Sequence, residues 1–251
     1  MKNLLLVSSL FLLGACTPIV KNHPPKTIQI NQIDNGNVNN SNYANMDKKH
    51  QMLLSKGKEL LSKGERKKAI FECFNPIIRD YEKIYLNSNK RIYSARTQAE
   101  YDFYAMSAKN EGKVAHILSK TWSEAYYLKA YTLIDLKELN VAKQTISKAL
   151  KLAPSNSKYL SEMGHIFNLV KDTKSAIRNY NLAEKYASFF SPENLKRKEL
   201  LKAKRGIGFS YTELNKLDKA ERIYREILAI DSGDKIAKRE LKYIQELKKR
   251  R

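Results

Sequence analysis

Cys16 has the most specific chemical context of any residue in the sequence. One positive residue, Lys2, comes first, then an apolar run at 4–13 and two small residues directly before the cysteine. A run of this length is too short to span a membrane but is typical of a secretory signal. We therefore predict that residues 1–15 are a signal peptide that is cleaved. The alternative is an uncleaved signal with an incidental cysteine.

The residues that end this signal, Leu13-Gly14-Ala15-Cys16, resemble the bacterial lipobox. The resemblance implies diacylglycerol transfer to the Cys16 thiol, cleavage before it and acylation of the new amino terminus. Several acyl chains on one residue give stable membrane anchoring, which a single chain does not. Thr17 rather than Asp follows, which by analogy favours the outer membrane of a Gram-negative organism. The expected location is the bacterial cell envelope, lipid-anchored and facing the periplasm.

The sequence offers little else that could do chemistry. It has no glycine-rich phosphate loop or nucleophile elbow. Its histidines have no metal-ligand spacing: His23, His50, His116 and His165. The other cysteine, Cys73, lies in an amphipathic segment where a buried small hydrophobe is expected. We therefore expect no enzyme activity, no cofactor and no metal site.

The chain has a formal net charge of +21, which is large for 251 residues. This charge suggests anionic partners, whether acidic protein surfaces, phospholipid or nucleic acid, but says nothing about the fold. The alternative is that the basic residues simply solvate exposed helix faces. Only 9 Gly and 6 Pro, among abundant Lys, Leu and Ala, favour helix over sheet.

Residues 16–45 comprise the cysteine and an asparagine-rich stretch, TPIVKNHPPKTIQINQIDNGNVNNSNYAN. The stretch has no helical period and few apolar residues, so we expect a disordered tether. As a flexible coil it would reach about 30 Å, enough to lift a domain off a membrane surface.

Farther along the chain, one spacing of small and bulky residues recurs. In 123–156, Ala142, Ile146 and Ala149 stand at offsets of four and three before Pro154. The matching places hold Ala176, Tyr180 and Ala183 in 157–188, and Ala220, Tyr224 and Ile227 in 201–234.

The unit at 123–156 resembles the tetratricopeptide repeat, a 34-residue pair of antiparallel helices. The small residues let the two helices approach closely, and the bulky ones fill the space around them. The resemblance implies an all-α solenoid of helical hairpins, with three repeats in 122–234 and a capping helix at 235–251.

Residues 46–121 fit this pattern less well, as a degenerate repeat followed by a helical segment. We expect Asn75 to cap a new helix that opens with Pro76, and a further helix at 92–108. The segment inserted before the last repeat, FFSPENLKRKEL, should lengthen the connection between two helices by ten residues, with Pro192 opening the next helix.

The resemblance also implies a concave groove lined by the first helix of each repeat. The groove positions we single out for partner binding are Tyr127, Tyr131, Lys158, His165, Lys202, Arg205 and Phe209. The aromatic rings could hold apolar side chains and the cations acidic ones, unless the tyrosines pack within the array. Some members of the family clamp a chaperone's terminal carboxylate with Lys, Asn, Asn, Lys and Arg. Only Lys202 matches that set, so we do not expect this clamp.

These observations predict a membrane-anchored protein-binding scaffold or assembly factor of the bacterial envelope, similar to tetratricopeptide-repeat pilotins and assembly lipoproteins. Its partners would be envelope proteins, acidic ones among them, with the membrane reached through the lipid anchor; nucleic acid is the less favoured ligand. The alternative is a basic module that binds anionic lipid, lipopolysaccharide or extracellular DNA.

Overall fold

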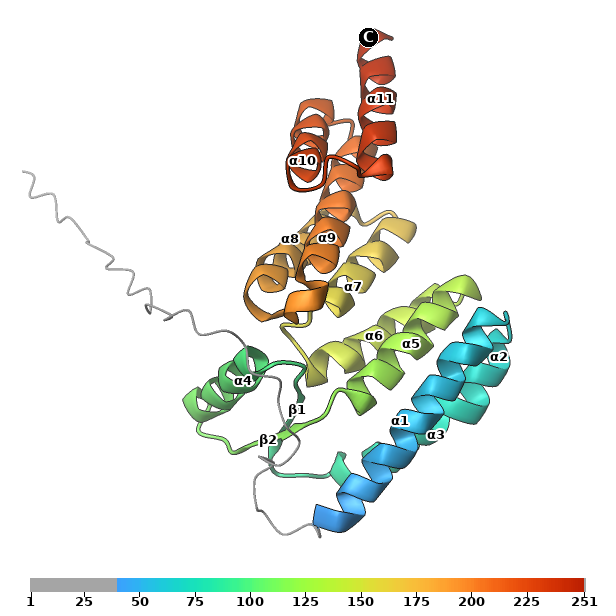
Figure 1. The fold of residues 1–251 in the computed structure, drawn as a ribbon, viewed down its shortest axis with the longest axis vertical. Helices are drawn as coiled ribbons and strands as arrows, with labels where there is room; N and C mark the ends of the chain where they lie inside the picture. The colour runs from blue at the N-terminus through green and yellow to red at the C-terminus, as the bar shows by residue number, and fades with distance from the viewer. Residues whose placement is uncertain (1–39, 251) are drawn as a thin grey trace, which may run out of the picture.

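The computed structural model describes residues 40–250, which form a curved stack of helical hairpins with one small strand pair at its side (Figure 1). The elements are α1 (Asn40–Ser62), α2 (Arg66–Lys68), the π-helix η2 (Ala69–Phe74), α3 (Asn75–Tyr85), β1 (Arg91–Ser94), α4 (Gln98–Asn110), β2 (Ala115–Leu118), α5 (Thr121–Asp135), α6 (Leu139–Leu152), α7 (Ser157–Leu169), α8 (Thr173–Phe190), α9 (Glu193–Glu213), α10 (Leu217–Ile230) and α11 (Lys235–Lys249).

The predicted solenoid is confirmed. The three repeats are the hairpins α5–α6, α7–α8 and α9–α10, and α11 follows as the cap. Each hairpin turns at a residue in the left-handed backbone region: Lys137 (φ 65°), Lys171 (φ 62°) and Asn215 (φ 55°). The three repeats therefore share the backbone conformation of the turn as well as the spacing of their small and bulky residues.

Small residues allow the close helix contacts, as the spacing indicated. The first small residue of each second helix, at positions 142, 176 and 220, is fully buried. Tyr180 of α8 packs against two glycines, Gly164 on α7 and Gly206 on α9, where a Cβ atom would lie 3.0 Å and 2.2 Å from its ring. Both helices approach that ring only because these two positions lack a side chain.

The prediction of a long connection before the last repeat is wrong. Helix α8 continues to Phe190 and α9 begins at Glu193, so only Ser191 and Pro192 link them. The inserted residues lengthen the two helices instead, because Glu199 in the added turns of α9 is buried and ion-paired with Arg96. Pro192 occupies the N-cap rather than the first helical position.

The prediction that Asn75 caps a new helix is also wrong. The chain stays helical from Arg66 through α2, η2 and α3, and Phe74 before α3 has helical backbone angles. The amide of Asn75 bonds to the carbonyl of Ile70, five residues back, as in a π-turn. Such a turn accommodates the ring and missing N–H of Pro76 without breaking the helix.

Residues 91–118 form a β–α–β unit that the sequence did not suggest. Strands β1 and β2 are parallel, in a register that pairs Arg91 with Ala115 and Ser94 with Leu118, and α4 connects them. The predicted helix at 92–108 therefore starts late, at Gln98. Thr97 caps it, because its Oγ1 accepts the Glu100 amide at 3.1 Å.

The amino-terminal boundary differs as well. Helix α1 begins at Asn40, so 40–45 is helical rather than tether, and Tyr43 is buried in the core of the first hairpins. The predicted signal peptide, Cys16 and the remainder of the tether lie outside the described residues.

Candidate protein-binding face

The first helices of successive hairpins, α1, α5, α7 and α9, lie side by side, and side-chain contacts join each to the next. Glu124 of α5 accepts from Lys158 of α7 at 2.8 Å and lies 3.7 Å from Lys58 of α1. Between α7 and α9, the Asn168 amide donates to the Ser210 hydroxyl at 3.0 Å. We call the outward surface of these four helices the first-helix face.

Three rings project from this face at the same repeat position, the ninth. They are Tyr131 on α5, His165 on α7 and Phe209 on α9. Tyr131 and Phe209 are 43% and 44% exposed, and His165 is exposed too. Leu169, one turn beyond His165, adds a 42% exposed apolar side chain. The structure thus places solvent-exposed rings in a row on the first helices of three consecutive hairpins.

Tyr127 lies apart from this row because it packs within the array, the alternative weighed for the tyrosines. Only 6% of the residue is exposed, and its ring stacks on Tyr159 with centroids 5.1 Å apart. The ammonium of Lys158 also lies 4.0 Å from the Tyr127 ring centroid. A partner could not contact Tyr127 without displacing these neighbours.

The predicted groove cations are each bound to a carboxylate of the chain itself. Besides the Lys158–Glu124 pair, Lys202 Nζ lies 2.9 Å from Glu162 Oε2, and Arg205 Nη1 lies 2.7 Å from Asp234 Oδ2. The side chains of Glu162 and Asp234 are both 3% exposed. These cations therefore link neighbouring hairpins before any partner arrives.

In the Lys158–Glu124 pair, the cost of burying two charges and the attraction between them shift each pKa in opposite directions. Burial raises the pKa of Glu124, but the charge and hydrogen bond of Lys158 outweigh it and hold that pKa below its ordinary value. Burial, together with the charge of Lys58, lowers the pKa of Lys158 more than Glu124 raises it. The pair therefore fixes geometry between two helices more than it adds net stability.

Sequence reasoning selected these cations for partner contact and overlooked Glu162 and Asp234 as their acceptors. One signal was available: Glu124 and Lys158 have opposite charges at the same position of adjacent repeats, 34 residues apart. Adjacent first helices place such residues side by side. Asp234 gives no such signal, since it lies beyond the last hairpin and also caps α11 by accepting the Ala237 amide.

Within the part of the chain that the structure covers, no three His, Cys, Asp or Glu side chains group as a metal site would require. No helix from α1 to α11 has the length and apolar character needed to cross a membrane. What the first-helix face offers is shape, exposed rings and fixed polar contacts, which suit binding.

Residues 123–156 match the family model described as "Tetratricopeptide repeat". Repeats of this family typically serve as non-enzymatic scaffolds for protein–protein interaction. No curated protein matches the sequence.

Among solved structures, a crystal structure of MamA is 16% identical, with a TM-score of 0.49, and covers 76% of this chain and 84% of its own. The first tetratricopeptide domain of Spaghetti (RPAP3), described as bound to the HSP90 peptide SRMEEVD, is 18% identical with a TM-score of 0.43 and covers 50% and 91%. The Sgt2 domain from Aspergillus fumigatus is 18% identical with a TM-score of 0.43 and covers 51% and 79%. The repeat architecture of this chain rests on its own hairpins and on the match at 123–156.

Proposed function

We propose that the protein is a lipid-anchored, non-enzymatic scaffold or assembly factor of the bacterial envelope that binds partner proteins on its first-helix face. The observation that carries this proposal is the row of Tyr131, His165 and Phe209. These rings stay exposed on the first helices of three consecutive hairpins. The basic residues beside them, in contrast, are hydrogen-bonded to carboxylates of the same chain.

Exposed aromatic side chains are the residue type that dominates the energy of protein interfaces. A row of three, spaced by one helix each, suits an extended segment that crosses the helices. The internal pairing of Lys158, Lys202 and Arg205 makes these cations a poor primary contact, because a partner that used them would leave buried carboxylates without a counter-ion. Lys202, the only match to the carboxylate clamp, is already held by Glu162. We therefore favour a partner segment with apolar anchors.

A binding series tests this proposal. Affinity capture of the intact chain from membranes of its source would supply the partner, and equilibrium binding would then be measured for each variant. We expect Tyr131→Ala and Phe209→Ala each to weaken binding by about 1–2 kcal/mol or more. The outer-face reversals Lys143→Glu and Arg222→Glu serve as controls and should have little effect.

The rival explanation is a basic surface that attracts any polyanion. Such a surface responds to total charge wherever it lies, and its affinity falls steeply with salt through counterion release. Equal losses from the outer-face reversals, a steep salt dependence and intact binding in the two alanine variants would favour that rival over a protein partner on the first-helix face.

Cys16 carries the proposed anchor and is tested separately. Cys16→Ala should leave an unprocessed precursor that takes up no labelled fatty acid in the bacterium. Processing of that variant to the normal mature size, with label incorporated, would remove the lipid anchor from the account while leaving the scaffold function untouched.

A further inference from the structure

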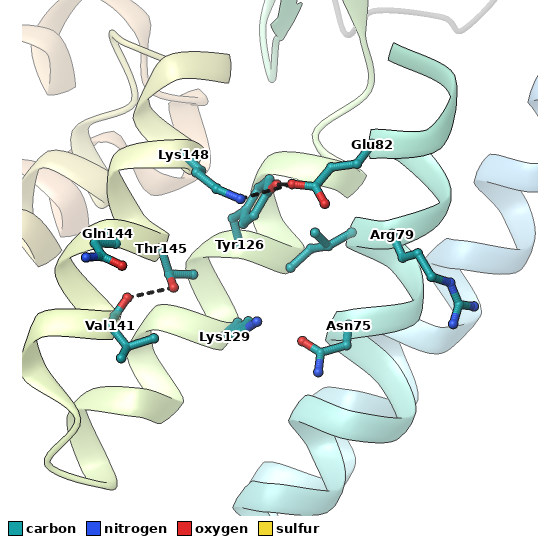
Figure 2. A pocket seen from close by; sticks show the side chains of 10 residues that line it. Asn75, Arg79, Glu82, Tyr126, Lys129, Val141, Gln144, Thr145 and Lys148 are labelled. Carbon is teal, nitrogen blue, oxygen red and sulfur yellow. Dashed lines mark hydrogen bonds and ion pairs between the residues drawn. The ribbon is translucent and has the colours of Figure 1, made fainter. Parts of the chain in front are cut away.

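A pocket opens where α3 and α6 flank α5, and Tyr126 and Lys129 line it from α5 (Figure 2). Its volume is about 430 Å³, within the range of small-molecule sites. Ile78 of α3, Tyr126 of α5 and Val141 of α6 supply apolar surface. The pocket is therefore large enough for a small organic group and not only for an ion.

The charged side chains of this pocket are mostly basic. Arg79, Lys129 and Lys148 line it together with a single carboxylate, Glu82. Three cations and one anion leave a formal charge of +2. Asp80, next along α3, lies 3.4 Å from Arg79, but its other oxygen accepts from His50 of α1, 3.0 Å away. The side chain of Arg79 is 75% exposed, and turning toward a ligand would require it to leave Asp80.

Glu82 is already occupied. Its Oε1 accepts from the Tyr126 hydroxyl and from Lys148 Nζ, the latter at 3.1 Å. Burial raises the pKa of Glu82, but these hydrogen bonds outweigh it and lower that pKa, so the carboxylate stays ionised. It therefore holds Lys148 in place and has little capacity left to neutralise Lys129.

Lys129 is the unusual member. Figure 2 shows Lys129 between α5 and α3. The side chain is half-buried, and no carboxylate of the described residues lies within ion-pair distance of its ammonium. Burial and the charge of Lys148 lower its pKa more than the charge of Glu82 raises it. A half-buried cation with no close counter-ion costs stability, which is hard to explain by packing alone.

We propose that this pocket binds a phosphate monoester, with Lys129 and Lys148 contacting the phosphate and Arg79 closing over it from α3. A phosphate monoester carries a charge of about −1.5 to −2 at neutral pH, which matches the pocket's excess of two cations better than a single carboxylate would. Thr145 and the amides of Asn75 and Gln144 stand at the same pocket to receive the polar part of the ester, and the apolar wall accepts its carbon skeleton.

The proposal is tested by isothermal titration of glycerol 3-phosphate into the full-length chain in detergent micelles. Wild type should bind, and Lys129→Met should bind about tenfold more weakly or worse, because one charge-assisted hydrogen bond is lost. Lys143→Met is the matched control: it removes one charge from α6 beside the pocket, but Lys143 does not line the pocket and its ammonium lies over the Phe167 ring of α7. Its affinity should stay within about twofold of wild type, since a distant exposed charge is screened.

Thermal melting excludes unfolding as the cause. Lys129→Met should melt at the same or a higher temperature than wild type, since it removes an uncompensated charge. Equal weakening by the two methionine variants, or undiminished binding by Lys129→Met, would each overturn the proposal.

A second set of titrations identifies the source of the phosphate. Micelles doped with phosphatidic acid present a monoester headgroup, whereas phosphatidylglycerol presents a diester. Lys129-dependent binding to phosphatidic acid but not to the soluble ester would support the site and assign it to a lipid headgroup. Binding to glycerol 3-phosphate would support it as a site for free metabolites. Binding to neither overturns it, and the outcome leaves the first-helix face unaffected, because no ring of that face lines the pocket.

Discussion

Lys158 and Glu124 lock the hairpins α5–α6 and α7–α8 together, with Nζ 2.8 Å from Oε1 and the same ammonium 4.0 Å from the Tyr127 ring centroid. One cation thus pairs with a buried carboxylate and also contacts the buried Tyr127 ring. Lys158, Glu124 and Tyr127 therefore hold the helices of the first-helix face together. Tyr131 and Phe209 remain exposed and available to a partner.

Breaking this pair should reveal its structural role. We expect Glu124→Gln to lower the free energy of unfolding by about 2 kcal/mol, because Lys158 loses its charged acceptor while staying largely covered. Adding Lys158→Met should restore most of the loss, since no unpaired charge remains. Urea unfolding of the two variants measures both effects. A double variant no more stable than Glu124→Gln would contradict this account.

The same carboxylate gives the chain a pH dependence. Glu124 has a pKa in the folded state below its ordinary value of 4.5. Its contribution to stability is therefore present above about pH 4.5 and is lost as the pH falls through the lower folded value. Wild type should lose more stability than Glu124→Gln when unfolding is followed from pH 6 down to about pH 3. Parallel curves for the two proteins would show that Glu124 does not titrate in this way.

Gly206 tests the close approach of α8 and α9. A Cβ atom there would lie 2.2 Å from the Tyr180 ring, so Gly206→Ala should cost about 1–3 kcal/mol even after the gain in helix propensity. Gly233→Ala is the control, because its nearest contact is Asp231 Oδ1 at 3.4 Å. Chemical denaturation should find the control close to wild type. A neutral Gly206→Ala would mean that the two helices are farther apart.

Arg96 ties the β–α–β unit to the solenoid. Its guanidinium lies 2.9 Å from Glu100 Oε1 and 2.8 Å from Glu199 Oε1, and all three side chains are at most 7% exposed. Arg96→Met should cost about 3–5 kcal/mol, because it leaves two buried carboxylates without a cation. Arg96→Lys should recover only part of this loss, since an ammonium cannot reproduce the planar fork. Full stability in the lysine variant would contradict the two-carboxylate geometry.

The three repeated hairpins could be predicted from the sequence, whereas the β–α–β unit and the lengthened helices α8 and α9 could not. Ala142, Ala176 and Ala220 recur at fixed offsets because each one sits at a helix contact that has the same geometry in every repeat. Arg96 and Glu199 lie 103 residues apart and pair only after folding, so no local sequence pattern could predict their ion pair. That long-range pair includes Glu199, one of the inserted residues that lengthen α9. The helix start predicted at Pro76 was wrong for another reason: a π-turn can accommodate a proline that would end an ordinary α-helix.

The candidate site divides in the same way. Repeat position alone predicted that Tyr131, His165 and Phe209 would share one face, because position fixes direction along a helix. It did not reveal which neighbours were already engaged, since that depends on contacts between helices. Tyr127 and Tyr131 stand four residues apart on α5, yet one is covered by Tyr159 and Lys158 and the other is exposed.

Site-specific photo-crosslinking in cells of the source organism tests the central claim most directly. A photoreactive amino acid would replace Phe209 on the first-helix face or, as the control, Arg222 of α10, whose side chain is 70% exposed. The account predicts a discrete protein adduct from position 209 and little from position 222, with the adduct reduced when Tyr131→Ala is present. Equal adducts from both positions, or adducts only with lipid, would contradict binding of a partner protein at the row of exposed rings.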